Sequence, residues 1–145
     1  MDIFTIGFTQ SSAERFFGRL KKAGIRLLMD VRLNNRSQLA GFAKQEDLKF
    51  FLSEICGMDY RYEPLLAPTQ EILAAYKKNG GQWSVYELQF TALLREREIE
   101  TQLSPSDFAD PTVLLCSEAT PENCHRRLVV EYLQQHWPDV KAIHL

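Results

Sequence analysis

The segment CSEATPENCHRR, residues 116–127, places several reactive side chains at one turn of the chain. It contains two of the three cysteines of the protein, two acids, one histidine and two arginines. An apolar run, TVLL, precedes the segment, and a run with helical character, LVVEYLQQHW, follows it. Thiols, carboxylates and imidazoles serve enzymes as nucleophiles and as general acids or bases. The segment therefore predicts a functional site at a strand-to-helix turn.

Five side chains are candidates for catalysis. Cys124 lies near the amino terminus of the predicted helix, where the helix dipole and free N–H groups lower the pKa of a thiol. Cys124 or Cys116 is the candidate nucleophile, and Glu118 or Asp30 is the candidate general base. His125 falls within the apolar stripe of the helix, so its side chain is expected to face the sheet close to the site.

Most of these residue types also have a purely structural interpretation. A histidine that faces a core is more often a hydrogen-bonded structural group than a catalyst, and a buried cysteine such as Cys116 is usually an inert, small hydrophobic residue. Glu118 could serve as a helix cap or as a solvated acid, and Cys56 is expected to be structural. Arg127 is expected to form a solvated ion pair with Glu131, four residues later on the same helix.

Arginines near the turn are candidates for binding an anion. Arg126 lies beside the apolar stripe of the helix, and Arg32 and Arg36 follow a second predicted strand within a long polar loop. Guanidinium groups and helix amino termini are common binding groups for phosphate. We also expect Arg126, more than Arg127, to hold the site together, with Asp30 and Glu118 as its candidate acidic partners.

The rest of the sequence predicts the elements that position these groups. Short apolar strands alternate with helices, and the strands are expected at residues 3–6, 26–31, 59–64, 112–116 and 140–145. The last helix is expected to start at Thr120, as its cap, and Pro121, as its first residue. This alternation is typical of a single α/β domain over residues 1–145, with an open, mostly parallel sheet of about five strands and helices on both faces. The central strands would be those that contain Ile3, Leu27 and Val113.

In an open parallel sheet, ligands bind outside the carboxyl ends of the strands. The first predicted strand leads to Thr9, the second to Asp30 and Arg32, the fourth to residues 116–118 and the fifth to His144. Parallel strands bring all of these groups to one edge of the sheet. We therefore expect one concavity to be lined by Asp30, Arg32, Cys116, Glu118 and His125.

The composition of the chain excludes several classes of protein. Its 145 residues are 45% hydrophobic and 25% charged, with a net charge of −2, so a general electrostatic attraction to nucleic acid or to an anionic membrane is not indicated. No apolar stretch approaches the roughly 20 residues of a membrane span. The start, MDIFTIGF, lacks the basic region of a signal peptide. An odd number of cysteines does not suggest a disulfide framework, which favours the cytoplasm.

The sequence predicts no metal centre and no particular cofactor. It contains neither CxxC nor HExxH, and it has no glycine-rich phosphate loop. A looser metal site formed by Cys116, Glu118, His125 and His144 is the alternative. No pattern in the sequence indicates an oligomeric state.

The chain resembles a known family, the domain-of-unknown-function family 488, over nearly its whole length. The most specific part is LLCSEATPENCHRRLVVEYL, which is similar to the family pattern of an apolar strand, Cys-x-Glu, a Pro and a Cys-His-Arg that opens a helix. TIGFT, MDVR and AIHL resemble other strands of the family. Ser37 is the match for the serine of a Pro-x-Ser, and Phe8 stands where the family usually has histidine. The resemblance assigns motif positions to Cys116, Glu118, Pro121, Cys124, His125 and Arg126.

The resemblance implies an α/β domain with an enzymatic site, but it supplies no reaction. We favour a small cytosolic enzyme that acts on an anionic, phosphate-bearing ligand such as a nucleotide or a nucleic acid. One alternative is a non-catalytic scaffold that binds an anion or a nucleic acid, and another is a thiol redox protein that uses Cys116 and Cys124. The candidate ligand-binding residues are Arg32, Arg36, Arg126, Thr9 and Ser37.

Overall fold

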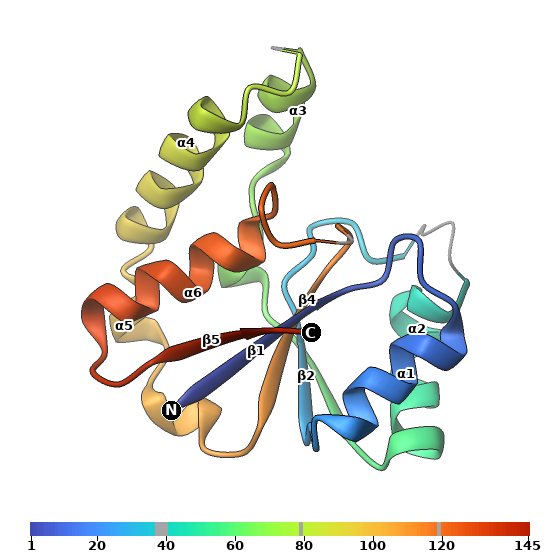
Figure 1. The fold of residues 1–145 in the computed structure, drawn as a ribbon. Coiled ribbons are helices and arrows are strands. Elements are labelled where there is room, and N and C mark those ends of the chain that lie inside the picture. The colour runs from blue at the N-terminus through green and yellow to red at the C-terminus, as the bar shows by residue number, and fades with distance from the viewer. Residues whose placement is uncertain (37–40, 79, 119) are drawn as a thin grey trace.

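The computed structural model describes residues 1–36, 41–78, 80–118 and 120–145. These residues form a five-stranded sheet in which every pair of neighbouring strands is parallel (Figure 1). The strand order is β3-β2-β4-β1-β5, so the predicted central strands are indeed the inner three. The predicted α/β fold is confirmed. The strands are β1 (Asp2–Gly7), β2 (Leu27–Asp30), β3 (Asp59–Tyr62), β4 (Thr112–Cys116) and β5 (Lys141–His144).

Helices cover both faces of the sheet, as predicted. One face packs against α1 and α2, and the other packs against α4 and α6 (Figure 1). A π-helical turn, Leu52–Cys56, continues α2, and none of the helices in the described part of the chain is long and apolar enough to cross a membrane. The helices are α1 (Ala13–Lys22), α2 (Gln45–Phe51), α3 (Gln70–Lys78), α4 (Trp83–Glu96), α5 (Ile99–Gln102) and α6 (His125–His136).

Alternation along the inner strands divides the core into two clusters. In β2, Leu28 packs into the cluster on the α1 and α2 face, whereas Met29 packs into the cluster on the α4 and α6 face. Val113 and Leu114 of β4 divide in the same way. Every residue of β4 is buried, which explains why the strand is apolar from Val113 to Cys116. The reactive segment therefore follows the most deeply buried strand of the sheet.

The start of α6 differs from the prediction. The helix begins at His125 with Cys124 as its N-cap, and not at Thr120 and Pro121. Pro121 instead opens a turn, in which the N–H of Cys124 donates to the Pro121 carbonyl at 3.2 Å. The turn places Cys124 and His125 together at the end of the helix that lies nearest the carboxyl end of β4.

Candidate functional site

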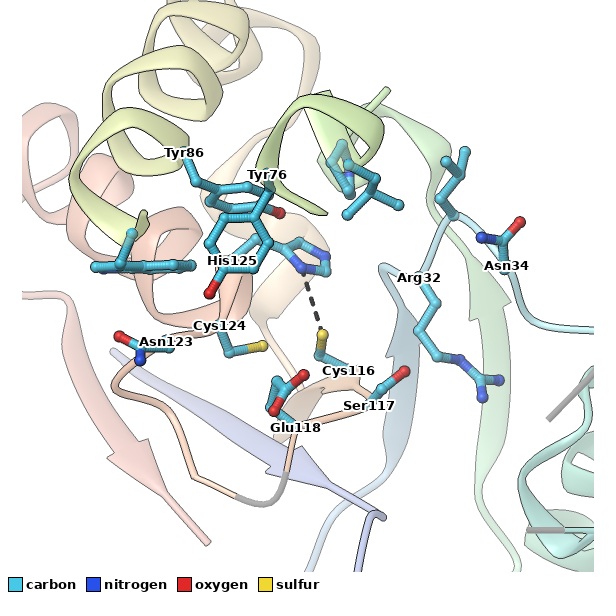
Figure 2. Close-up of a pocket in the computed structure, with 14 residues that line it drawn as sticks. Arg32, Asn34, Tyr76, Tyr86, Cys116, Ser117, Glu118, Asn123, Cys124 and His125 are labelled. Atoms are coloured by element: carbon cyan, nitrogen blue, oxygen red, sulfur yellow. Dashed lines mark hydrogen bonds between the residues drawn. The ribbon is translucent and has the colours of Figure 1, made fainter. Parts of the chain in front are cut away.

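A cavity of about 280 Å³ opens beyond the carboxyl ends of β2 and β4 (Figure 2). Its floor is formed by the last residue of β4, by the two residues after it and by the residues at the start of α6. The hairpin of α3 and α4 supplies an aromatic wall. The side chains of the floor and the wall are Cys116, Ser117, Glu118, Asn123, Cys124, His125, Tyr76, Trp83 and Tyr86.

Cys116 and His125 form a buried, oriented pair at the inner end of the cavity. The Sγ atom of Cys116 lies 3.3 Å from Nδ1 of His125, and the Nε2 atom of His125 lies 2.7 Å from the Val31 carbonyl oxygen. Because a carbonyl only accepts, Nε2 carries the proton, and in a neutral imidazole Nδ1 accepts from the Cys116 thiol. A nucleophile, a base and a group that orients the base are the parts of a cysteine-dependent active site.

The two cysteines at the site differ in their affinity for a proton. Burial raises the pKa of the Cys116 thiol, but a hydrogen bond from Cys124, the charge of Arg126 and the N–H groups of Glu118 and Ser117 outweigh it, so the pKa is lowered. Burial and the neighbouring Cys116 raise the pKa of Cys124. The expectation of a lowered Cys124 pKa is therefore wrong, because the loss of solvent around this N-cap thiol outweighs the helix dipole. Cys116 is the better candidate nucleophile.

Arg126 supplies positive charge to the site from behind the cavity floor. Its side chain is 0% exposed, and Nη1 donates to the Glu118 carbonyl oxygen at 2.5 Å and to Cys124 Sγ at 3.6 Å. Nε and Nη2 have no hydrogen-bond partner in the described part of the chain. Within the described residues, no carboxylate forms an ion pair with Arg126. The predicted pairing with Asp30 or with the Glu118 carboxylate is wrong, since Arg126 contacts the main chain of Glu118.

Gly7, the last residue of β1, allows this close packing. A Cβ atom at this position would lie 1.5 Å from the Glu118 carbonyl oxygen and 2.7 Å from Nη1 of Arg126. The absence of a side chain therefore lets the loop after β4 and the arginine meet against β1. This close contact holds the loop that follows Cys116 and carries Glu118.

Asp30 lies outside the cavity, contrary to the prediction that it lines the same concavity. Its carboxylate is 0% exposed and accepts from Arg32 Nε at 2.8 Å, Arg32 Nη2 at 2.9 Å and the Tyr60 hydroxyl at 2.6 Å. Arg32 lines the cavity, but its guanidinium points away from Cys116 (Figure 2) and also donates to the Ala43 carbonyl oxygen. The pair is fully engaged within the protein, so Asp30 has no access to a ligand in the cavity.

The remaining predicted ligand-binding residues are not gathered at the cavity. Arg36 is exposed and lines a separate hollow together with Gln45 and Tyr62. The Thr9 hydroxyl and N–H both donate to the Ser117 carbonyl oxygen, so Thr9 supports the cavity floor from outside. Ser37 lies outside the described residues. The structure therefore places Arg32, Arg36 and Arg126 in three different environments.

Glu118 is an exposed acid that lines the cavity, as predicted. Figure 2 shows its carboxylate on the same side of the cavity as Ser117 and Cys116, while Tyr76 and Tyr86 lie across from it. A carboxylate in this place can exchange protons with a bound ligand or with a water molecule that enters the cavity.

Sequence reasoning missed the aromatic wall. Trp83 and Tyr86 are stacked, with ring centroids 4.9 Å apart and an interplanar angle of 19°, and Tyr76 lies 5.1 Å from Tyr86. The spacing of Trp83, Tyr86 and Phe90 is the spacing of a buried helix stripe, and Phe90 is indeed fully buried. The pattern alone could not separate a core stripe from a ligand wall.

Three buried side chains at the site could together hold a thiophilic metal ion. The ligand atoms of Cys116, Cys124 and His125 all lie within 4.8 Å of one another. This set differs from the alternative set considered above, because His144 instead pairs with Thr5 at 2.6 Å. The buried charge of Arg126 beside Cys124 opposes a second cation and favours a negative thiolate.

Comparison with known proteins identifies a family. The sequence profile described as "Domain of unknown function DUF488" matches residues 12–133, which is most of the chain. No curated protein and no solved structure matches. The match covers α1 through most of α6 and so includes every residue of the cavity floor and of its aromatic wall. The chain therefore belongs to the domain-of-unknown-function family DUF488.

Proposed function

We propose that the protein is a small enzyme that uses Cys116 as a nucleophile and His125 as its proton acceptor and donor. The observation that carries the proposal is the arrangement of Cys116 Sγ, the His125 ring and the Val31 carbonyl at the inner end of a cavity. The lowered pKa of Cys116, to which the Arg126 charge contributes, supports the same assignment. Glu118 is the second acid–base group.

The proposed reaction is a two-step substitution through a covalent intermediate. Cys116 Sγ attacks an electrophilic atom of the substrate while the thiol proton passes to His125 Nδ1. The leaving group departs with this proton, and a bond between sulfur and substrate remains. Water then attacks the intermediate, with His125 or Glu118 accepting one of its protons, and the thiol of Cys116 is restored.

The arginines support the binding of an anionic group only outside the cavity. Arg32 is engaged by Asp30, and Arg36 opens into a separate hollow. A phosphate on the substrate would therefore remain outside the cavity while an uncharged part reaches Cys116.

The cytoplasm is the proposed compartment. It keeps thiols reduced, and Cys56, Cys116 and Cys124 are all free.

Selective alkylation tests the proposed nucleophile. With iodoacetamide at pH 7, we expect Cys116 to be labelled at least about tenfold faster than Cys124 or Cys56, because alkylation follows the thiolate fraction. The variant His125→Gln, whose amide can still donate to Val31, should slow the labelling of Cys116. Peptide mass spectrometry measures each rate. Equal slow labelling of all three cysteines in the native protein would reject the nucleophile and favour the non-catalytic scaffold.

A thiol redox function is the second candidate, because the fold brings Cys116 and Cys124 together although they lie eight positions apart in the sequence. Their sulfur atoms lie within 4.8 Å of each other. A peroxide would oxidise the Cys116 thiolate to a sulfenic acid, and Cys124 would then form a disulfide with release of water. A Cys116–Cys124 disulfide found by mapping under non-reducing conditions after stoichiometric peroxide, and reversed by a dithiol, would favour this candidate.

A further inference from the structure

We infer that the cavity takes a planar heteroaromatic ring of the nucleobase type and presents it to Cys116. The inference rests on the proposed function for the reaction, but the binding that it describes is independent of catalysis. A free nucleotide and an unpaired base in a single strand offer this same chemistry. Three observations carry it: an aromatic side of the cavity, a polar side opposite, and a buried donor without a partner.

The first observation is the apolar and aromatic side. Tyr76, Trp83 and Leu73 are only partly buried in the protein although they belong to an apolar layer, so part of each side chain faces the cavity. Tyr86 completes this side behind them. Aromatic side chains bind flat rings through their faces and edges, and they do so with little regard to the sequence of bases.

The second observation is the polar side that faces these rings. Asn123 and Glu118 are both exposed and both line the cavity, and Figure 2 shows them across from Tyr76 and Tyr86. An amide and a carboxylate match the donor and acceptor edges of a base.

The third observation is the indole N–H of Trp83. The Nε1 atom is buried and has no hydrogen-bond partner in the described part of the chain. Buried donors are almost always satisfied, so an orphaned one in the wall of a cavity requires an explanation. A small turn of the Trp83 side chain toward the cavity would bring this N–H to an acceptor atom on a bound ring.

The size and charge of the cavity restrict the ligand to the ring. A volume of about 280 Å³ lies just below the range of about 300 to 1,000 Å³ that is usual for pockets of drug-sized ligands. Glu118 is acidic, and the charge of Arg32 is engaged by Asp30. The ring would therefore enter the cavity while the sugar and any phosphate stay at its mouth.

Binding to a ligand series tests the inference. The protein carries Cys116→Ser to prevent turnover, and calorimetry measures adenosine, cytidine, their 5′-monophosphates and ribose 5-phosphate. We expect at least one nucleoside to bind within about threefold of its monophosphate, and ribose 5-phosphate to bind at least about fivefold more weakly, the factor that corresponds to one lost stacking contact. Ribose 5-phosphate that binds as tightly as the nucleotides, or no binding of any ring, would overturn the inference.

Variants of the aromatic side locate the binding. Trp83→Leu and Tyr76→Leu, on two different helices, should each weaken the nucleoside at least about fivefold. Leu88→Ala, at a position of α4 that is 74% exposed and away from the cavity, is the matched control and should change nothing. Circular dichroism confirms that each variant folds. Unchanged binding in both folded variants would overturn the inference.

Two further measurements distinguish a failure of the ring-binding inference from a failure of the proposed function. In the unsubstituted protein, a bound nucleoside should protect Cys116 from iodoacetamide but leave Cys56 unaffected. An unreactive Cys116 with intact ring binding would reject only the nucleophile. A short single-stranded oligonucleotide that binds more than about tenfold tighter than the nucleosides identifies nucleic acid as the source of the ring, and equal binding identifies the free nucleotide.

Discussion

The carboxyl ends of β2 and β4 each meet a buried arginine, but the two arginines are satisfied to very different degrees. Arg32 is 2% exposed, donates to both carboxylate oxygens of Asp30 and also donates to the Ala43 carbonyl oxygen. Arg126 is 0% exposed, has two nitrogens without a partner and forms no ion pair in the described part of the chain.

The difference separates a structural arginine from one that acts on a neighbour. The charge of Arg32 is compensated within its own network, so it stabilises the loop after β2 and leaves the cavity without an anion clamp. The charge of Arg126 is not compensated by an acid, and its field is available to the thiol of Cys116. Buried polar groups that remain incompletely paired concentrate at functional sites, because their charge is free to act on a ligand or a nucleophile.

The largest expected effect is the loss of stability when the ion pair between Arg32 and Asp30 is broken. Arg32→Met leaves the Asp30 carboxylate buried without its charge partner, and such losses cost about 3–5 kcal/mol. Arg126→Met removes one main-chain hydrogen bond and strands no acid, so it should cost only about 1–2 kcal/mol of unfolding free energy. Urea titration of both variants measures the difference. Equal losses would show that Arg126 has an unrecognised acidic partner.

A smaller effect is expected where Arg126 and the loop after β4 pack against β1. Gly7→Ala places a Cβ on the Glu118 carbonyl oxygen and should cost about 1–3 kcal/mol while slowing the labelling of Cys116. Gly18→Ala is the matched control, because nothing lies within 4 Å of its added Cβ and the position is in the middle of α1. The control should be neutral or slightly stabilising. A Gly7→Ala protein with unchanged stability and labelling would contradict the close packing.

The smallest effect is a shift in the pH dependence of alkylation. Since the pKa of Cys116 is lowered, its alkylation rate should rise with pH and level off below the usual range of a thiol. Arg126→Met removes a positive charge that favours the thiolate, so the midpoint should move to higher pH. Arg127→Met, which loses the predicted and confirmed ion pair with Glu131, should leave the midpoint unchanged and cost less than about 1 kcal/mol. An equal shift of the alkylation midpoint in both variants would contradict the assignment of Arg126 as the charge that favours the Cys116 thiolate.

Much of the fold and part of the site are predictable from sequence patterns that act locally. Alternation of apolar strands and helices specifies a covered parallel sheet, and the uninterrupted apolar run of β4 indicates its central place. The apolar stripe of the last helix places His125 toward the sheet, where it meets Cys116. Strand ends of a parallel sheet share an edge, so the location of the cavity also follows from sequence.

The sequence by itself thus determined the sheet, its two covered faces and the position of Cys116 and His125 at one edge of the sheet. The tertiary structure decided which groups are charged and which are exposed to the cavity. Asp30 and Cys116 both end inner strands. The carboxylate of Asp30 is paired with Arg32, whereas Cys116 lines the cavity. Which thiol loses its proton depends on burial, on Arg126 and on the directions of N–H groups. These quantities arise from contacts between distant segments, so no local pattern of residues encodes them.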